Sequence, residues 1–328
     1  MQYTYLGNTG VEVSRLCFGT MSFGGDADRE TSAALYQRCR EAGINFFDCA
    51  DMYPTRDSAG LSEEILGELI SGERDELVIT SKVFNPVGPD RNDRGLSRRH
   101  IMHAVEDSLR RLKTDRIEVY YLHSFDPHTP IEESLRALED LLSAGKILYP
   151  AVSNWAAWQI ATALGIAEKR NWSPVACVQP MYSLAKRQAE VEILPLSRAR
   201  NLGVLSYGPV GGGLLSGKYT RGTRPERGRL VENDRYQQRY GAEFYYDVAE
   251  RFSAHCAERG VHPVTAAVAW VKSNPAISAP IIGARNLEQL EASLAAADLE
   301  LDAEWYNELS ALSPAPPPAT DRSETATG

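Results

Sequence analysis

Three short apolar runs in the first half of the chain each end in a polar residue: NFFD at 45–48, VITSK at 78–82 and VYYLH at 119–123. The runs are rich in β-branched and aromatic residues, and amphipathic stretches separate them, which predicts parallel strands alternating with helices. Parallel strands bring the side chains at their carboxyl ends to one edge of the sheet. We therefore expect Asp48, Lys82 and His123 at one edge, together with Tyr53, which follows the first run in DMYP.

The same alternation continues along the chain. Eight strands are expected at residues 16–19, 45–48, 78–82, 119–123, 147–153, 175–179, 203–207 and 279–282. Helices are expected at residues 31–42, 62–70, 97–112, 131–144, 158–169 and 191–201. Two short runs at 2–6 and 11–14, joined by the turn GNTG, predict a β-hairpin before the first strand. Eight such units without a linker favour a (β/α)8 TIM barrel over two domains.

Two segments depart from this regularity. Residues 208–245, after the seventh strand, are rich in Gly and Arg and predict a long loop that is functional or mobile. The tail at 313–328, SPAPPPATDRSETATG, has almost no large apolar residues and is expected to be disordered. We therefore expect a single barrel domain over residues 1–312, followed by a Pro-rich tail.

Composition narrows the class of ligand. The chain has 328 residues, of which 43% are hydrophobic and 24% charged, a profile typical of a soluble globular protein. A net charge of -9 disfavours nucleic acid as a partner, and no apolar run approaches the roughly 20 residues of a membrane span. The N-terminus has no signal-peptide pattern, and the five cysteines form no CxxC pair. We expect a cytoplasmic protein with reduced cysteines that binds a small molecule and no membrane.

A carboxylate, an ammonium, a phenol and an imidazole at one edge indicate proton transfer to a carbonyl oxygen. A phenol, with a pKa of about 10, is a weak acid at neutral pH. An ammonium about 4 Å away favours phenolate by roughly three pKa units, so Lys82 is expected to bring Tyr53 towards neutrality. Asp48 would keep Lys82 charged, and His123 would orient the oxygen. Capping, packing or core hydrogen bonding is the alternative for each residue alone, and it explains a lysine at a buried strand end least well.

Glycine signals for a dinucleotide occur late in the chain. The GxGxxG pattern of a Rossmann fold is absent after the first strand. Tyr182 and Lys186 have the YxxxK spacing of short-chain dehydrogenases, but they follow a strand, and that interpretation is disfavoured. GPVGGGLLSGKY at 208–219 follows the seventh strand, where barrels commonly bind phosphate. A flexible lid without a ligand is the alternative for this segment.

Basic residues near the glycine segment suggest how a dinucleotide would be held. After the eighth strand, Arg285 precedes a helix and is expected to pair with a 2'-phosphate, which favours NADP(H) over NAD(H). A local basic excess, for which a solvated loop without a partner is nearly as well supported, is formed by Arg221, Arg224, Arg227 and Arg229.

With these residues assembled, the chain resembles the aldo-keto reductase family over residues 1–312. The resemblance rests on FFDCADMY, ITSKV and YYLH, and on LGNTGVEVSRLCFGTM, SEEILGELI, GKILYPAVSN, VQPMYSL and GGLLSGKY. It implies a catalytic tetrad of Asp48, Tyr53, Lys82 and His123, with no metal. The nicotinamide cofactor contacts that it implies are Gly19, Thr20, Met21, Asp48, Ser153, Asn154, Gln179, Tyr207, Gly208, Val210, Gly213, Leu214, Gly283, Arg285 and Gln289. PTRDSAGLSEE at 54–64 is longer than the usual turn there, and Ala292 and Ser293 replace a frequent Glu-Asn pair.

The resemblance also implies a reaction: reversible NADPH-dependent reduction of an aldehyde or ketone to an alcohol, with Tyr53 as general acid. NAD(H) stays open as the cofactor. The small-molecule carbonyl substrate would contact Tyr53, Phe84, His123 and Trp155. The family includes channel-associated subunits that keep the tetrad, so a cofactor-sensing regulatory or binding subunit with little turnover is the alternative. The physiological substrate and assembly into a homo-oligomer stay open.

Overall fold

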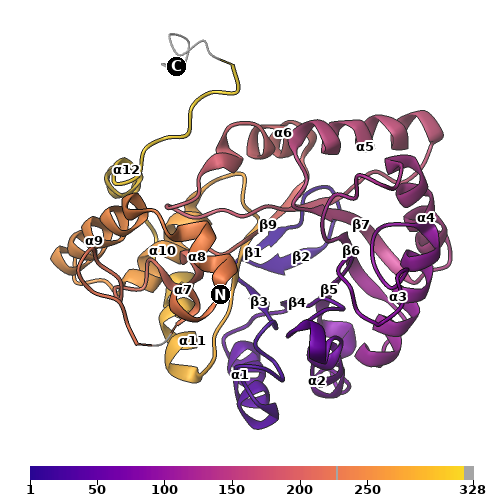
Figure 1. The fold of residues 1–328 in the computed structure, drawn as a ribbon, viewed down its shortest axis with the longest axis horizontal. Helices are drawn as coiled ribbons and strands as arrows, with labels where there is room; N and C mark the ends of the chain where they lie inside the picture. The colour runs from indigo at the N-terminus through magenta and orange to yellow at the C-terminus, as the bar shows by residue number, and fades with distance from the viewer. Residues whose placement is uncertain (227, 321–328) are drawn as a thin grey trace.

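A closed barrel of parallel strands forms the centre of the molecule, in the order β10-β3-β4-β5-β6-β7-β8-β9 (Figure 1). The computed structural model describes residues 1–226 and 228–320. The barrel strands are β3 (Cys17–Gly19), β4 (Phe46–Asp48), β5 (Val78–Val83), β6 (Ile117–Leu122), β7 (Ile147–Ser153), β8 (Cys177–Gln179), β9 (Gly203–Tyr207) and β10 (Ala279–Ile282). Each corresponds to one of the expected strands, and the TIM-barrel fold is confirmed.

Helices lie around the barrel and connect its strands (Figure 1). Their starts follow local capping chemistry, as where the Asp28 carboxylate accepts from the Thr31 N–H and begins the first helix. The helices are α1 (Arg29–Glu41), α2 (Leu61–Leu69), α3 (Arg98–Leu112), α4 (Ile131–Ser143), α5 (Ala157–Arg170), α6 (Ile193–Arg200), α7 (Arg229–Glu232), α8 (Asp234–Tyr240), α9 (Glu243–Glu258), α10 (Pro263–Ser273), α11 (Leu287–Leu294) and α12 (Ala303–Ala311). Short 3-10 turns lie at Arg56–Ser58, Arg74–Glu76, Gln188–Glu190, Gly211–Gly213 and Ala295–Ala297. The six helices expected from periodicity are present, with ends that differ by a few residues.

The expected N-terminal hairpin consists of β1 (Tyr3–Tyr5) paired antiparallel with β2 (Glu12–Ser14). Leu6 and Val13 are fully buried and pack with the side chains of the barrel interior. The connecting turn needs a glycine at position 7, because φ there is +55° and a Cβ would collide with the backbone of residue 203. The hairpin therefore packs against the end of the barrel opposite the carboxyl ends of its strands.

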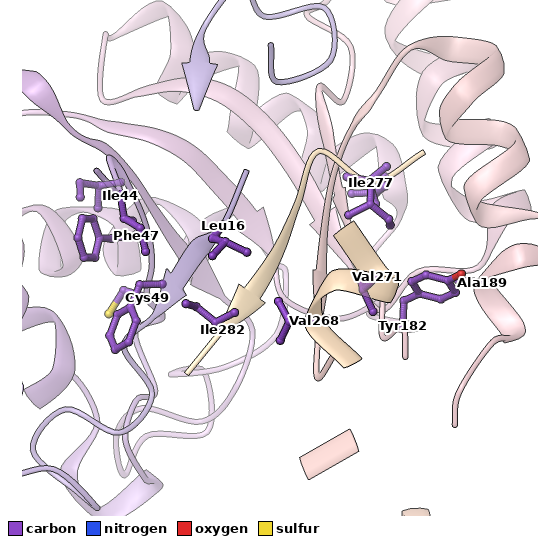
Figure 2. Packing of buried hydrophobic residues seen from close by; sticks show 14 of the residues in the cluster. Leu16, Ile44, Phe47, Cys49, Tyr182, Ala189, Val268, Val271, Ile277 and Ile282 are labelled. Atoms are coloured by element: carbon purple, nitrogen blue, oxygen red, sulfur yellow. The ribbon is translucent and has the colours of Figure 1, made fainter. Parts of the chain in front are cut away.

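Two apolar clusters support the barrel. The smaller one fills its interior and includes Phe46, Val119 and Tyr121, all fully buried. The larger one lies between the strands and the surrounding helices. Figure 2 shows part of this second cluster, in which Leu16, just before β3, lies near Ile282 of β10 and Val268 of α10. Replacing such a side chain with alanine typically lowers the free energy of unfolding by about 2–5 kcal/mol. This packing therefore holds the strand ends in place.

The segment at 208–245 differs from the long loop that was expected. It contains a 3-10 turn, then α7 and α8, and α9 begins within it at Glu243. Asn233 caps α8 through its side chain, and the helices bury Leu230 and Tyr240. α7 and α8 have 4 and 7 residues, too few for an amphipathic period to show in the sequence. Arg227 lies outside the described residues.

The end of the chain is only partly described. After α12, residues 314–318 form neither helix nor strand, and residues 321–328 of the expected disordered tail lie outside the described residues. All five cysteines are buried and free. Within the part of the chain that the structure describes, no helix is long and apolar enough to cross a membrane.

Candidate active site

The four residues expected at one edge meet at the carboxyl ends of β4, β5 and β6. Asp48 is the last residue of β4, Lys82 lies near the end of β5, and His123 directly follows β6. Parallel pairing aligns these strands, with Asp48 opposite Thr80 and Lys82 opposite Tyr121. Tyr53 lies in the connection after β4, where its carbonyl accepts from the Ser62 N–H at 3.2 Å and ties it to α2. Strand register and one helix contact therefore bring the four side chains together.

Asp48 and Lys82 form a buried ion pair. The Lys82 Nζ donates to Asp48 Oδ2 at 2.6 Å and to the Cys49 carbonyl at 2.6 Å. The other carboxylate oxygen of Asp48 accepts from Thr80 Oγ1 at 2.6 Å and from Gln179 Nε2 at 2.8 Å. The side chains of the pair are 4% and 0% exposed, so water screens them little. Both charges are thus held by direct hydrogen bonds.

Lys82 also faces the phenol. Its Nζ lies 5.0 Å from the centre of the Tyr53 ring. Asp48 and Tyr53 raise the pKa of Lys82 despite the opposing effect of burial, so the ammonium stays charged at neutral pH. The residues around Lys82 therefore keep a charged hydrogen-bond donor beside the phenol.

The acidity of Tyr53 differs from what the lysine alone suggested. Burial raises the pKa of Tyr53 to about 12, and the charge of Lys82 only partly opposes that rise. The expected shift towards neutrality is therefore wrong, because a calculation from one charge leaves out the loss of hydration of phenolate. Tyr53 is a neutral phenol at pH 7, which is the form that can donate a proton.

His123 is neutral and lies beside Tyr53. Burial first, and then the charge of Lys82, hold the pKa of His123 well below its usual value. Its ring and that of Tyr53 have centroids 6.0 Å apart and meet edge to face. The Nδ1 of His123 lies 3.2 Å from Nδ2 of Asn85, just past the end of β5. A phenol and a neutral imidazole therefore lie side by side at the mouth.

Four residues with expected cofactor contacts form one hydrogen-bonded chain around His123. The Tyr207 hydroxyl donates to Asn154 Oδ1 at 2.7 Å, and Asn154 Nδ2 donates to the His123 carbonyl at 2.9 Å. The Ser153 hydroxyl donates to the Gln179 carbonyl at 2.9 Å. Asn154 adopts a left-handed φ of +57°, which directs its amide across the strand ends. Hydroxyl and amide groups suited to a carboxamide thus cluster beside the tetrad.

The glycine segment after β9 curves sharply away from the strand. Gly208 and Gly213 have φ values of +72° and +100°, which favour glycine. Val210 is partly exposed, whereas Leu214 is fully buried under the turn. Space beside Gly208 is open, since a Cβ there would meet no atom within 4 Å. The open space beside the Gly208 backbone would allow a phosphate to approach it closely.

The end of β3 and the residues directly after it contribute the next group of expected contacts. Thr20 is fully buried, its hydroxyl donates to the Asp48 carbonyl at 3.2 Å, and it also contacts the Ser62 hydroxyl at 2.9 Å. Gly19 and Met21 flank it and are partly exposed. Gly283, which follows β10, is exposed, and a Cβ on it would lie 3.7 Å from the Gly19 carbonyl. These residues therefore lie on one side of Asp48, where β3 and β10 pair.

Arg285 has a partner that sequence did not suggest. Its Nε lies 2.9 Å from Asp26 Oδ2 in the loop after β3, and Arg229 of α7 lies 4.0 Å from the same oxygen. Gln289 is exposed, and its Oε1 accepts from the Arg285 N–H at 3.2 Å. Asp26 thus joins the insertion after β9 to the segment before α11.

The expected substrate residues differ in accessibility. Phe84 is partly exposed, but Trp155 is only 4% exposed. Trp155 packs edge to face on Phe125, with centroids 5.4 Å apart, and Phe125 also meets Trp158, which is 63% exposed. The accessible part of this aromatic cluster is therefore Trp158, at the start of α5.

Several residues that the sequence suggested as functional instead contact other side chains of the protein. Tyr182 is fully buried, donates to Glu190 at 2.7 Å and does not lie on a helix, so the YxxxK spacing is coincidental. Lys186 donates to the Tyr245 hydroxyl at 2.5 Å. Arg221 forms an ion pair with Asp247. The Arg224 guanidinium stacks on Tyr246, 3.3 Å from the ring centroid.

Three contacts of the site were missed from sequence. Thr80 could have been found, because it lies two residues before Lys82 in VITSK and so faces the same side of the strand. Asn85 and Asp26 lie in loops, where no periodicity indicates which way a side chain points.

Among the described residues, no group of three or more His, Cys, Asp or Glu side chains is arranged to hold a metal ion.

Comparisons with known proteins agree with this arrangement. A family model described as the aldo/keto reductase family matches residues 15–314. The chain is 40% identical over 328 residues to a Bacillus subtilis (strain 168) protein named uncharacterized oxidoreductase YrpG, covering 96% of this chain and 97% of that protein. It is 36% identical over 308 residues to an Arabidopsis thaliana protein named probable voltage-gated potassium channel subunit beta, covering 91% and 92%. It is 31% identical over 347 residues to Escherichia coli (strain K12) protein tas, covering 95% and 97%.

The family match and the relatives extend over nearly the whole chain. Aldo/keto reductases are oxidoreductases of carbonyl compounds that generally use nicotinamide cofactors. The barrel, the buried lysine and its carboxylate partner fit that chemistry. This chain belongs to the aldo/keto reductase family.

Proposed function

We propose that the protein is an NADPH-dependent reductase of aldehydes or ketones, acting reversibly, in which Tyr53 is the general acid. The observation that carries the proposal is the buried Lys82 ammonium, held by Asp48 at 2.6 Å and lying 5.0 Å from the Tyr53 ring. Burying a charge is costly unless it is paired. The energetic cost of burying this ion pair is explained if the ammonium acts on the neighbouring phenol at the mouth of the barrel.

The chain's own residues would handle the proton. A bound nicotinamide cofactor would supply hydride to the carbonyl carbon. As negative charge develops on the carbonyl oxygen, Tyr53 gives that oxygen its phenolic proton, and the adjacent Lys82 ammonium stabilises the phenolate that remains. His123, neutral at pH 7, donates a hydrogen bond that holds the oxygen near the phenol. Asp48 keeps the ammonium in place.

The cofactor contacts follow from the polar groups around the tetrad. Ser153, Asn154 and Gln179 would hold the nicotinamide carboxamide, and the Tyr207 ring would lie against the nicotinamide. The turn at Gly208, Val210, Gly213 and Leu214 would receive the pyrophosphate. Arg285 and Gln289, with Gly283, would surround the adenosine end. Gly19, Thr20 and Met21 would border the nicotinamide beside Asp48. An arginine here favours a 2'-phosphate and thus NADP(H) over NAD(H), although Asp26 shares its charge.

Two further parts of the proposal concern the substrate and its setting. We propose a small carbonyl compound that contacts Tyr53, His123, Phe84 and the aromatic cluster to which Trp155 belongs. We also propose that residues 1–312 form a single domain and that the protein acts in the cytoplasm. A homo-oligomer is compatible with both.

One experiment tests the proposed reaction. Purified protein is mixed with NADPH and a panel of aldehydes and ketones, and loss of NADPH absorbance is followed, with NADH in parallel. Tyr53→Phe should lower turnover by about 10²–10⁴-fold while NADPH affinity stays nearly unchanged, because only the acid is lost. Tyr5→Phe, on the exposed hairpin, is the matched control. Unchanged turnover in Tyr53→Phe would reject the assignment.

A second candidate is a cofactor-sensing subunit with little turnover. The observation that favours it is the 36% identity to a protein named as a probable potassium channel β subunit. The same carbonyl panel separates the candidates, since protein that binds NADPH tightly but consumes it with none of the substrates supports sensing.

A further inference from the structure

We propose that Asn85 is a positioning residue that fixes the tautomer of His123, so that the imidazole proton sits on Nε2 and points towards the substrate. The contact that carries this inference is between Asn85 Nδ2 and His123 Nδ1, 3.2 Å apart. The inference rests on the proposed function, because it assigns how one residue of that site presents its hydrogen bond.

The backbone explains why these two side chains meet. The His123 N–H donates to the Val83 carbonyl at 2.9 Å, which continues the pairing of β5 with β6 by one step. Asn85 lies two residues past Val83, where the chain leaves the barrel. From the other side, Asn154 Nδ2 donates to the His123 carbonyl at 2.9 Å. The backbone of His123 is therefore held from both sides, and Asn85 contacts the Nδ1 atom of its ring.

The chemistry of the contact selects one tautomer. A neutral imidazole carries one N–H, on either Nδ1 or Nε2. An amide nitrogen is only a donor, so Nδ1 must accept from Asn85 and the ring proton must lie on Nε2. His123 is held neutral by burial and by the charge of Lys82, so a doubly protonated ring does not compete. An Nε2–H can donate to a carbonyl oxygen, whereas a bare Nε2 would repel it.

The reverse arrangement has a distinct signature. If the amide of Asn85 were rotated, its Oδ1 would accept from an Nδ1–H, and Nε2 would be left without a proton. Nitrogen chemical shifts distinguish a protonated from an unprotonated ring nitrogen. The tautomer can therefore be measured directly, without reference to turnover.

The first arm of the test is NMR of protein labelled with ¹⁵N at its histidines, of which the chain has six. The His123 signals are assigned by their loss in His123→Gln. At neutral pH we expect an unprotonated Nδ1 and a protonated Nε2. A protonated Nδ1 in the unmodified protein would overturn the inference, whatever its activity. If the expected tautomer is seen but no carbonyl is reduced, the inference about Asn85 stands and the proposed reaction fails.

The second arm replaces the donor with an acceptor of nearly the same shape. Asn85→Asp should invert the tautomer, because a carboxylate accepts from Nδ1–H. We expect kcat/KM for carbonyl reduction to fall by about 10- to 100-fold, with the NADPH Kd changed less than about threefold. Asn92→Asp adds the same charge to the same loop at an exposed site that faces no tetrad residue in the described contacts. Equal tautomers and equal kcat/KM in the two Asp variants would exclude the proposed role.

Discussion

The ammonium of Lys82 and the carboxylate of Asp48 lie 2.6 Å apart, with side chains no more than 4% exposed. Such a pair contributes little net stability compared with apolar residues, but removing one partner leaves an uncompensated buried charge. We therefore expect Asp48→Ala to lower the free energy of unfolding by about 3–5 kcal/mol. The double variant Asp48→Ala with Lys82→Met should recover part of that loss. Urea denaturation monitored by circular dichroism gives both values.

A surface pair is the control for this prediction. Arg29 and Glu68 lie 2.5 Å apart, with side chains 55% and 47% exposed. Because water screens such pairs, Glu68→Ala should cost less than about 1 kcal/mol. Equal losses from Asp48→Ala and Glu68→Ala would contradict a buried charge that depends on its partner.

The pKa of Tyr53, raised by burial to about 12, predicts different pH profiles for reduction and for alcohol oxidation. Reduction needs the protonated phenol, which is present at every pH below about 12, so this group should leave the rate of reduction flat near neutrality. Alcohol oxidation needs phenolate, and its fraction rises about tenfold for each pH unit below the pKa. We therefore expect log kcat/KM for oxidation to rise with a slope near one between about pH 7 and 10. Steady-state rates in constant ionic strength test this, and a flat oxidation profile would argue against Tyr53 as the base.

These results show which parts of the active site can be predicted from the amino-acid sequence. All eight strands and the positions of Asp48, Lys82 and His123 follow from short apolar runs ending in polar residues, because strand period and register are local properties. The acidity of Tyr53 depends on burial by distant segments, which no local pattern reports. α7 and α8 escaped prediction because each is too short for a helical period. The contact of Asn85 with His123 was not predicted either, because Asn85 lies in a loop, where no periodicity indicates the direction of a side chain.

The ion pair between Asp26 and Arg285 predicts how cofactor preference can be changed. Arg285 would bind the 2'-phosphate that distinguishes NADPH from NADH, so Arg285→Ala should raise the NADPH Kd by about 10-fold or more and the NADH Kd much less. Asp26→Asn frees Arg285 from its partner at 2.9 Å and should tighten NADPH binding by a few-fold. Fluorescence titration measures both constants.

Arg259→Ala is the control for the loss of one positive charge. Arg259 directly follows α9 and pairs with Glu308 at 2.5 Å. Its removal should change neither cofactor constant by more than about twofold, because its partly exposed charge is already paired with Glu308 and is screened by salt. If Arg259→Ala and Arg285→Ala weaken NADPH binding equally, net charge and not a phosphate contact sets the preference.

The position of Gly212 indicates how the insertion after β9 packs against the glycine segment. Its φ is +68°, and a Cβ on it would lie 2.6 Å from the ring of Tyr236 in α8. Gly212→Ala must therefore shift that ring and adopt a strained backbone, at a cost of about 1–3 kcal/mol. Because α8 packs against the turn where a pyrophosphate would bind, we also expect NADPH binding to weaken. Gly222→Ala, in the same insertion, has no strained φ and meets no atom within 4 Å. Calorimetry and NADPH titration of the two variants should separate them, and an equally mild effect of both would mean that α8 does not depend on this contact.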